Sequence, residues 1–236
     1  MKALLLLPLA VALLAGCPMT PVHVDQLHLR YATAPQPDRV AESLFLSIDP
    51  ASVPDATRTT DPQTKPIEIY GLQTFVRRDV RNVLLDYFMD VRTVEGIAPR
   101  ARTGYVADVR IARVDTIADT STTIAVVGGE TGVATQHRAV GMIDWSVTIR
   151  DIATNEVVYS FADRAVGSFA LNNVDHSPDA IASVLETALI RLAQDLRTQR
   201  IGATLRARAQ PQVAAPAPAP TSAVPVPAQV DPPPPQ

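Results

Sequence analysis

Residues 141–149, Gly-Met-Ile-Asp-Trp-Ser-Val-Thr-Ile, form the most regularly patterned stretch of this 236-residue chain. Apolar residues alternate with polar ones, which predicts a β-strand with one buried face and one solvated face. A turn-forming run, Asp-Ile-Ala-Thr-Asn, follows at residues 151–155 and separates this strand from a second alternating run that contains Tyr159 and Phe161. The two runs therefore predict an antiparallel hairpin at the centre of the fold. Its buried positions are expected to be Gly141, Ile143, Trp145, Val147, Ile149, Val157, Tyr159 and Phe161.

Further strands and loops are predicted on both sides of this hairpin by alternation and by clusters of turn-forming residues. The expected strands are Val22–Tyr31 with a bulge, Ser43–Ile48, Ile67–Tyr70, Tyr105–Val114 and Thr122–Val127. Proline and threonine predict a long surface loop over Ala51–Pro66, and glycines predict a hairpin loop over Gly128–Gly132.

Two amphipathic helices are predicted by apolar residues at helical spacing. One should begin after an N-cap at Thr74 and end near Met89. The other should begin at Ser177-Pro178 and run to about Arg200, with Gly202 closing it.

One α/β domain of the α+β type is therefore expected over residues 21–208. Its sheet should be mixed and mainly antiparallel, with both helices on one face. The core should combine Val80, Leu84, Phe88, Ile143, Trp145, Val147, Leu185 and Leu192.

The N-terminus predicts export. Lys2 precedes an apolar run that starts at Ala3, and residues 1–16 fit a signal peptide that is too short to span a bilayer. The run ends in Leu14-Ala15-Gly16-Cys17, which resembles the lipobox of bacterial lipoproteins, and Cys17 is the sole cysteine. That resemblance implies a diacylglycerol on the Cys17 sulfur and a further acyl chain, such as palmitate, on its nitrogen. The alternative is an ordinary cleaved signal peptide followed by a chance cysteine.

Acyl chains on Cys17 would anchor the mature protein to a membrane, since two or three chains hold a protein stably where one does not. Residues 17–20 would then be the acylated N-terminus and a short tether. In lipoproteins of this kind an aspartate after the cysteine is associated with retention at the inner membrane. Pro18 occupies that position here, which favours the periplasmic face of the outer membrane and leaves the inner membrane open.

Residues 209–236 differ in composition from the rest of the chain. They contain 10 prolines and one charged residue, Asp231, so they are expected to be disordered with polyproline II bias. Fully extended, such a tail would reach on the order of 85 Å. A passive linker and a ligand for a partner are both consistent with this composition.

The sequence contains no motif that indicates an enzyme. The four histidines are far apart and lack metal-ligand spacing, and the glycines near residue 128 lack the lysine of a phosphate-binding loop. Asp108 and Asp144 fall on the polar faces of strands, where solvation explains them. We therefore expect no catalytic residue, no metal and no cofactor. The mature chain has 20 basic and 24 acidic residues, which does not indicate binding to nucleic acid.

Arg77, Arg78 and Arg81 are the one candidate binding patch. They occupy the first turns of the predicted helix, where the helix dipole disfavours cations. Two interpretations remain open: an ordinary solvated helix face, or a site for an anionic ligand or an acidic partner.

The order of elements over residues 105–197 resembles that of small periplasmic lipoproteins. These include auxiliary lipoproteins of ABC-type envelope transport systems, the lipopolysaccharide-assembly lipoprotein LptE, and lipoprotein activators of penicillin-binding proteins. The resemblance implies a non-catalytic accessory subunit that docks on an envelope protein partner in assembly or lipid transport. The alternative it implies is a regulator or anchor of peptidoglycan synthesis. The proline-rich tail departs from the penicillin-binding-protein activators, in which such a stretch precedes the domain.

Overall fold

The computed structural model describes residues 21–32, 34–59, 67–96, 101–127, 130–171 and 177–209. It has two β-sheets and a layer of helices, which confirms the predicted α+β class. The larger sheet has the strand order β5-β2-β6-β7-β8, and the smaller has the order β1-β4-β3. The strands of the larger sheet are β2 (Leu44–Ile48), β5 (Val91–Glu95), β6 (Tyr105–Val127), β7 (Glu130–Asp151) and β8 (Val157–Leu171). Those of the smaller sheet are β1 (Val22–His23), β3 (Ala56–Arg58) and β4 (Glu68–Tyr70).

The larger sheet is mixed, as its sequence predicts. Strand β2 pairs in parallel with both β5 and β6, over short stretches. Strands β6, β7 and β8 are long and antiparallel, and they make up most of the sheet. The Asp151–Asn155 turn joins β7 to β8 as expected: the Asp151 carboxylate accepts hydrogen bonds from the amides of Ala153 and Thr154.

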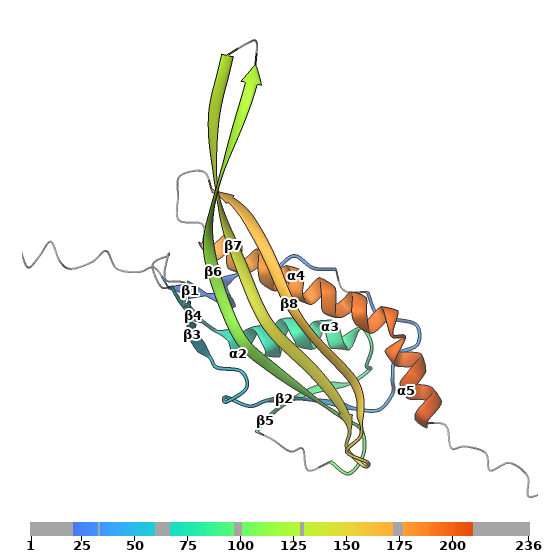
Figure 1. Cartoon of the computed structure of the whole chain (residues 1–236). Helices are drawn as coiled ribbons and strands as arrows, with labels where there is room; N and C mark the ends of the chain where they lie inside the picture. The colour runs from blue at the N-terminus through green and yellow to red at the C-terminus, as the bar shows by residue number, and fades with distance from the viewer. Residues whose placement is uncertain are drawn as a thin grey trace, which may run out of the picture.

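One face of the larger sheet is covered by a layer of helices (Figure 1). The short 3-10 helix η1 (Val24–Gln26) is not part of this layer. The first helix of the layer is continuous and made of α2 (Leu72–Phe75), a π-helical segment η2 (Val76–Val80) and α3 (Arg81–Leu85). The second is α4 (Ser177–Thr198), which is followed by α5 (Ile201–Ala209).

The core lies between this helical layer and the sheet. Trp145 is 3% exposed and packs edge-on against Phe161, with the ring centroids 5.5 Å apart, and against Phe75. All eight residues of the predicted core set are buried, which confirms that part of the prediction. Val157, expected on the buried face of the hairpin, is instead 49% exposed, because it lies at the start of β8 next to the turn.

Helix α4 approaches the sheet most closely at two glycines. Gly141 and Gly167 are direct partners across β7 and β8. A Cβ atom on Gly141 would lie 2.5 Å from the carbonyl oxygen of Ala180, and one on Gly167 would overlap the backbone nitrogen of Val184. The absence of side chains here lets the helix backbone rest directly on the sheet.

The β6–β7 hairpin is longer than the sequence predicted. The expected strands Tyr105–Val114 and Thr122–Val127 are one strand with a register shift between Ile111 and Arg113. Strand β7 begins at Glu130, so residues 130–132 of the expected Gly128–Gly132 loop belong to it. Beyond the end of β8 the hairpin continues as two strands only (Figure 1).

The N-terminal prediction was wrong beyond its first residues. Only Val22–His23 form a strand; Val24–Gln26 form a 3-10 helix, η1, and residues 27–32 have no regular structure. The alternation of Leu27, Leu29 and Tyr31 reflects packing of an irregular segment against the core rather than sheet pairing. Strand β3 also lies inside the predicted Ala51–Pro66 loop.

Two helix ends differ from prediction. The first helix starts at Leu72, and its N-cap is Gly71, in the left-handed region (φ 84°), rather than Thr74. The helix ends at Leu85 rather than at Met89. At the other end, Arg200 in the left-handed region (φ 48°) separates α4 from α5. Gly202 therefore lies inside α5, where a Cβ would collide with the carbonyl oxygen of Asp38, and it does not close α4.

The predicted signal peptide, Cys17 and the predicted tail beyond residue 209 lie outside the described residues. Within the described residues, no helix is long and apolar enough to cross a membrane.

The close contact of α4 with Gly141 and Gly167 leads to a prediction about stability. Gly141→Val should lower the free energy of unfolding by about 2 kcal/mol or more, because overpacking beneath a fixed helix backbone cannot be relieved by side-chain rotation. Ser168→Val is the control: Ser168 adjoins Gly167 but is exposed, so the change should stay within about 0.5 kcal/mol. Urea denaturation measures both, and an unchanged midpoint for Gly141→Val would contradict the proposed packing.

Candidate functional site

The three candidate arginines lie on the first helix. Arg77 and Arg78 belong to η2, and Arg81 is the first residue of α3. Their guanidinium groups contact three different parts of the molecule rather than one cavity.

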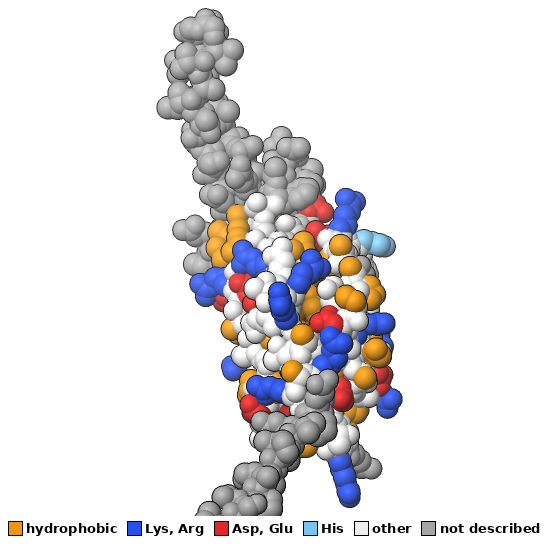
Figure 2. Space-filling view, turned by 90° about the vertical axis from the view of Figure 1, so that its right-hand side faces the viewer, with side chains coloured by type: hydrophobic (Ala, Val, Ile, Leu, Met, Phe, Trp, Pro, Cys, Tyr) orange, Lys and Arg blue, Asp and Glu red, His pale blue; other side chains and the backbone are white. Residues whose placement is uncertain are grey.

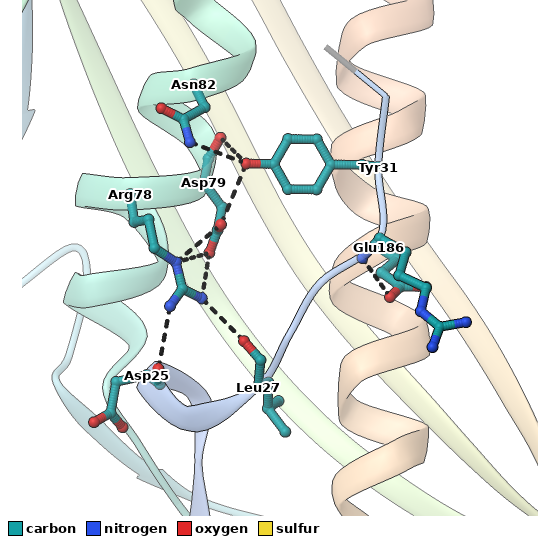
Figure 3. Close-up of polar contacts among 8 residues, drawn as sticks. Asp25, Leu27, Tyr31, Arg78, Asp79, Asn82 and Glu186 are labelled. Carbon is teal, nitrogen blue, oxygen red and sulfur yellow. Dashed lines mark hydrogen bonds and ion pairs between the residues drawn. The ribbon is translucent and has the colours of Figure 1, made fainter.

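Arg78 joins this helix to the N-terminal segment, residues 24–37. Its Nη1 donates to the carbonyl oxygen of Asp25 at 3.1 Å, and its Nη2 donates to that of Leu27 at 3.3 Å. Its Nε and Nη2 also contact the carboxylate of Asp79 at 3.0–3.2 Å (Figure 3). These hydrogen bonds to Asp79 raise the pKa of Arg78. Arg78 thus holds the backbone of the N-terminal segment in place.

Asp79 is the buried partner in this cluster. It is 4% exposed, and its carboxylate accepts a hydrogen bond from the hydroxyl of Tyr31 at 3.2 Å. Asn82 donates in turn to the Tyr31 oxygen at 3.4 Å (Figure 3). Burial is the largest cause that raises the pKa of Tyr31. We call Tyr31, Arg78, Asp79 and Asn82 the N-terminal clamp; a shallow hollow of about 410 Å³ lies over it.

Arg77 and Arg81 point elsewhere. Arg77 pairs with Glu95 of β5 at 3.0 Å, and both side chains are exposed. The Nε of Arg81 donates to the carbonyl oxygen of Val91, where β5 begins, at 3.0 Å. Arg81 therefore fastens β5 to the helix. The geometry gives each of the three arginines an intramolecular partner, which favours a structural role for them.

The N-terminal segment is fastened further along its course. The amide of Arg30 donates to Glu186 of α4 at 2.6 Å, and the amide of Ala34 donates to Asp86 at 2.9 Å. Asp86 is buried, and burial is the main reason that its pKa is raised. The segment therefore crosses the outer side of the helical layer and is attached to both of its helices.

Sequence reasoning missed Tyr31, Asp79, Asp86 and Glu186. One signal was available: Asp79 and Asp86 are seven residues apart, so they share one helix face with the apolar stripe. Acidic residues on such a face indicate buried hydrogen-bond partners. Nothing in the sequence identified those partners as backbone amides and a tyrosine of the N-terminal segment.

The face of the larger sheet that carries no helices is polar. Arg164 contacts Asp144 at 2.5 Å across β7 and β8, and Arg150 lies 3.9 Å from Asp108. A shallow hollow of about 580 Å³ on this face includes Arg110, Asp144, Ser146 and Arg164 in its lining. Burial is the largest cause raising the pKa of Asp108, and Arg150 opposes it. The two aspartates that the sequence assigned to a solvated face are partners in cross-strand ion pairs.

The face seen from the right of Figure 1 carries scattered basic, acidic and apolar side chains, with basic side chains more prominent than acidic ones (Figure 2). Among the described residues, no group of three or more His, Cys, Asp or Glu side chains could hold a metal ion.

No protein-family model matches the sequence, and no curated protein matches it. Solved structures resemble the fold at low similarity. A Xanthomonas campestris protein of the DUF330 family has a TM-score of 0.46 and 12% identity, covering 81% of this chain and 99% of that one. A Helicobacter pylori protein described as a neuraminyllactose-binding hemagglutinin homologue has a TM-score of 0.40 and 8% identity, covering 80% and 99%. A minor lipoprotein from Acinetobacter baumannii has a TM-score of 0.34 and 14% identity, covering 71% and 95%. Similarity at this level does not indicate what this chain binds.

The N-terminal clamp predicts different effects for two neighbouring arginines. Arg78→Met should lower the free energy of unfolding by about 2 kcal/mol, because the buried Asp79 carboxylate loses its cationic partner. Arg77→Met removes only an exposed ion pair and should change it by less than about 0.5 kcal/mol. Hydrogen exchange provides a second readout: amides of residues 25–34 should exchange faster in Arg78→Met alone. Equal effects of the two substitutions would argue against the clamp.

Proposed function

We propose that this protein is a lipid-anchored lipoprotein of the bacterial envelope that acts by binding, as a non-catalytic accessory subunit of an envelope assembly or lipid-transport complex. The observation that carries the proposal is the Leu14-Ala15-Gly16-Cys17 box after an apolar run with a positive start. Cys17 would carry the acyl chains, and Pro18 after it favours the outer membrane.

The N-terminal segment supports a short distance between anchor and domain. Four residues lie between Cys17 and Val22, the first residue of β1, and the five steps from one to the other span about 17 Å in an extended chain. From Val24 onward the segment is fixed to the helical layer by Arg78, Asp86 and Glu186. A domain attached in this way works close to the membrane surface.

The open face of the sheet is the surface that we assign to the partner. The opposite face is covered by helices, which the N-terminal segment crosses in turn, whereas the residues around Ser146 and Ser160 are accessible. Two cross-strand ion pairs, Arg150 with Asp108 and Arg164 with Asp144, lie on this face. Such a face is suited to docking on another protein rather than to chemistry at one residue.

Acylation can be tested directly. Cells that express the protein should incorporate labelled palmitate, and Cys17→Ser should abolish both the label and membrane attachment, because no other thiol is available. Met19→Ser is the matched control and should remain labelled. A Cys17→Ser protein that is still labelled and membrane-bound would refute the lipid anchor.

The partner can be identified by photo-crosslinking in intact cells. A crosslinking amino acid at Ser146 or Ser160 should capture an envelope protein, whereas the same residue at Arg30, on the helical side, should capture much less. Capture of a transporter or an outer-membrane assembly protein supports the proposal. Capture of a peptidoglycan synthase supports the alternative, a regulator or anchor of cell-wall synthesis. Equal capture from both sides would contradict the assignment of the open face.

A further inference from the structure

The two-stranded end of the β6–β7 hairpin has no partner strand within the described chain. Pairing between β7 and β8 ends where His137 meets Leu171, and pairing between β2 and β6 ends at Asp108. The β6–β7 register nevertheless continues to Val127 and Glu130. We call residues 120–127 and 130–136 the β-arm; it projects from the end of the domain (Figure 1). At about 3.4 Å per residue it extends on the order of 25 Å.

An isolated β-arm of this kind is energetically unfavourable in water. Two strands alone are marginally stable, and both outer edges leave unpaired backbone N–H and C=O groups. Proteins usually shorten such edges, place charges on them or cover them.

The two outer strands of the larger sheet, β8 and β5, carry such protective charges. Asp163 occupies an inward position of the edge strand β8, and Arg191 of α4 contacts it at 3.1 Å. Arg191 also donates a hydrogen bond to the backbone carbonyl oxygen of Arg164 in β8 at 3.2 Å. This carbonyl group therefore already has a side-chain partner. At the opposite edge, β5 carries Arg92 and Glu95, both in ion pairs.

The β-arm lacks that protection. Between Thr120 and Gln136 the sequence has one charged residue, Glu130, and is otherwise rich in Thr, Val and Ala. Charges are frequent in β6 before this point, at Asp108, Arg110, Arg113, Asp115 and Asp119. The chain therefore changes composition near the place where its third strand ends.

We propose that the β-arm pairs edge to edge with the β-arm of a second copy of this chain. Strands β6 and β7 run antiparallel within one arm. Two copies that stand side by side in the same orientation therefore present β6 of one to β7 of the next in antiparallel sense, the pairing that β-sheets favour. The common orientation rests on the proposed lipid anchor, which fixes every copy to one membrane by the same end.

A lipid bilayer is a less suitable partner for the β-arm than a second copy of the chain. The hydrocarbon interior offers no hydrogen bonds to free strand edges, so an open two-stranded ribbon is not stable there. A second copy supplies the missing backbone partners on one edge of the β-arm, and a further copy can supply them on the other. Because β6 of one copy meets β7 of the next, the contact is heterologous and allows more than two copies to join.

Analytical ultracentrifugation of the mature chain carrying Cys17→Ser tests the proposal without a membrane. The sedimenting mass should rise with concentration to at least twice that of the monomer. In a shortened variant, Asn-Gly replaces residues 121–136 and joins Thr120 to its register partner His137 in a two-residue turn. This variant should stay monomeric. The control pair Ser160→Lys and Ser168→Lys adds charge to the already protected β8 and should leave assembly unchanged.

Two results would overturn the proposal: a parent chain that stays monomeric at every concentration, or a shortened variant that assembles like the parent. Thermal unfolding should show that the shortened variant keeps its fold, since the deleted residues lie beyond the three-stranded part of the sheet. Should it unfold, Thr122→Lys with Val126→Lys provides a full-length test through charge repulsion at the edge, and undiminished assembly would refute the proposal. A parent protein that incorporates no labelled palmitate in cells would refute the lipid anchor without changing these sedimentation results.

Discussion

The contact between helix α4 and strands β7 and β8 is the interaction on which the other layers depend. Gly141 and Gly167 remove the side chains that would hold the helix away, so its apolar stripe reaches Trp145 and the rest of the core. With α4 in place, the hydroxyl of Tyr87, just after α3, can donate to the carbonyl oxygen of Ala193, which joins the two helices. The N-terminal segment then has a surface to cross. Sheet, helices and N-terminal segment are thus successive layers, each supported by the one beneath.

The clamp at Arg78 and Asp79 connects this architecture to the proposed anchor. Backbone carbonyls of an irregular segment need partners when they lie against a folded domain. Arg78 supplies them for Asp25 and Leu27, while the buried Asp79 fixes the guanidinium. The arginines that looked exposed and available in the sequence are therefore engaged in joining elements. The opposite face of the sheet carries no helices, and it is the face assigned to a partner in the proposed function.

The edges of the larger sheet differ in how they meet solvent. At the β8 edge the inward Asp163 pairs with Arg191, which also donates a hydrogen bond to the carbonyl oxygen of Arg164. The β-arm has a single charged residue, Glu130, and two edges without a partner strand in the described chain. The two edges belong to neighbouring strands of one sheet, β8 and the β6–β7 hairpin. A need for solubility would apply to both edges alike, so it does not explain why only one of them is protected. A protected edge on the domain and an open edge on the arm are consistent with selective strand pairing at the arm.

Local patterns in the sequence determined the strand at 141–149, the turn after it, the stripe of α4 and the core residues, because periodicity reports which side of an element is buried. The sequence alone also carries the Leu14-Ala15-Gly16-Cys17 stretch that resembles a lipobox. Tertiary structure decided the rest. The Arg78 contact to Leu27 joins residues 51 positions apart, and no local pattern encodes such a meeting. Strand β5 was missed because its mostly exposed residues lack the expected alternation. The isolation of the β-arm depends on where β2 and β8 end, which only their packing fixes.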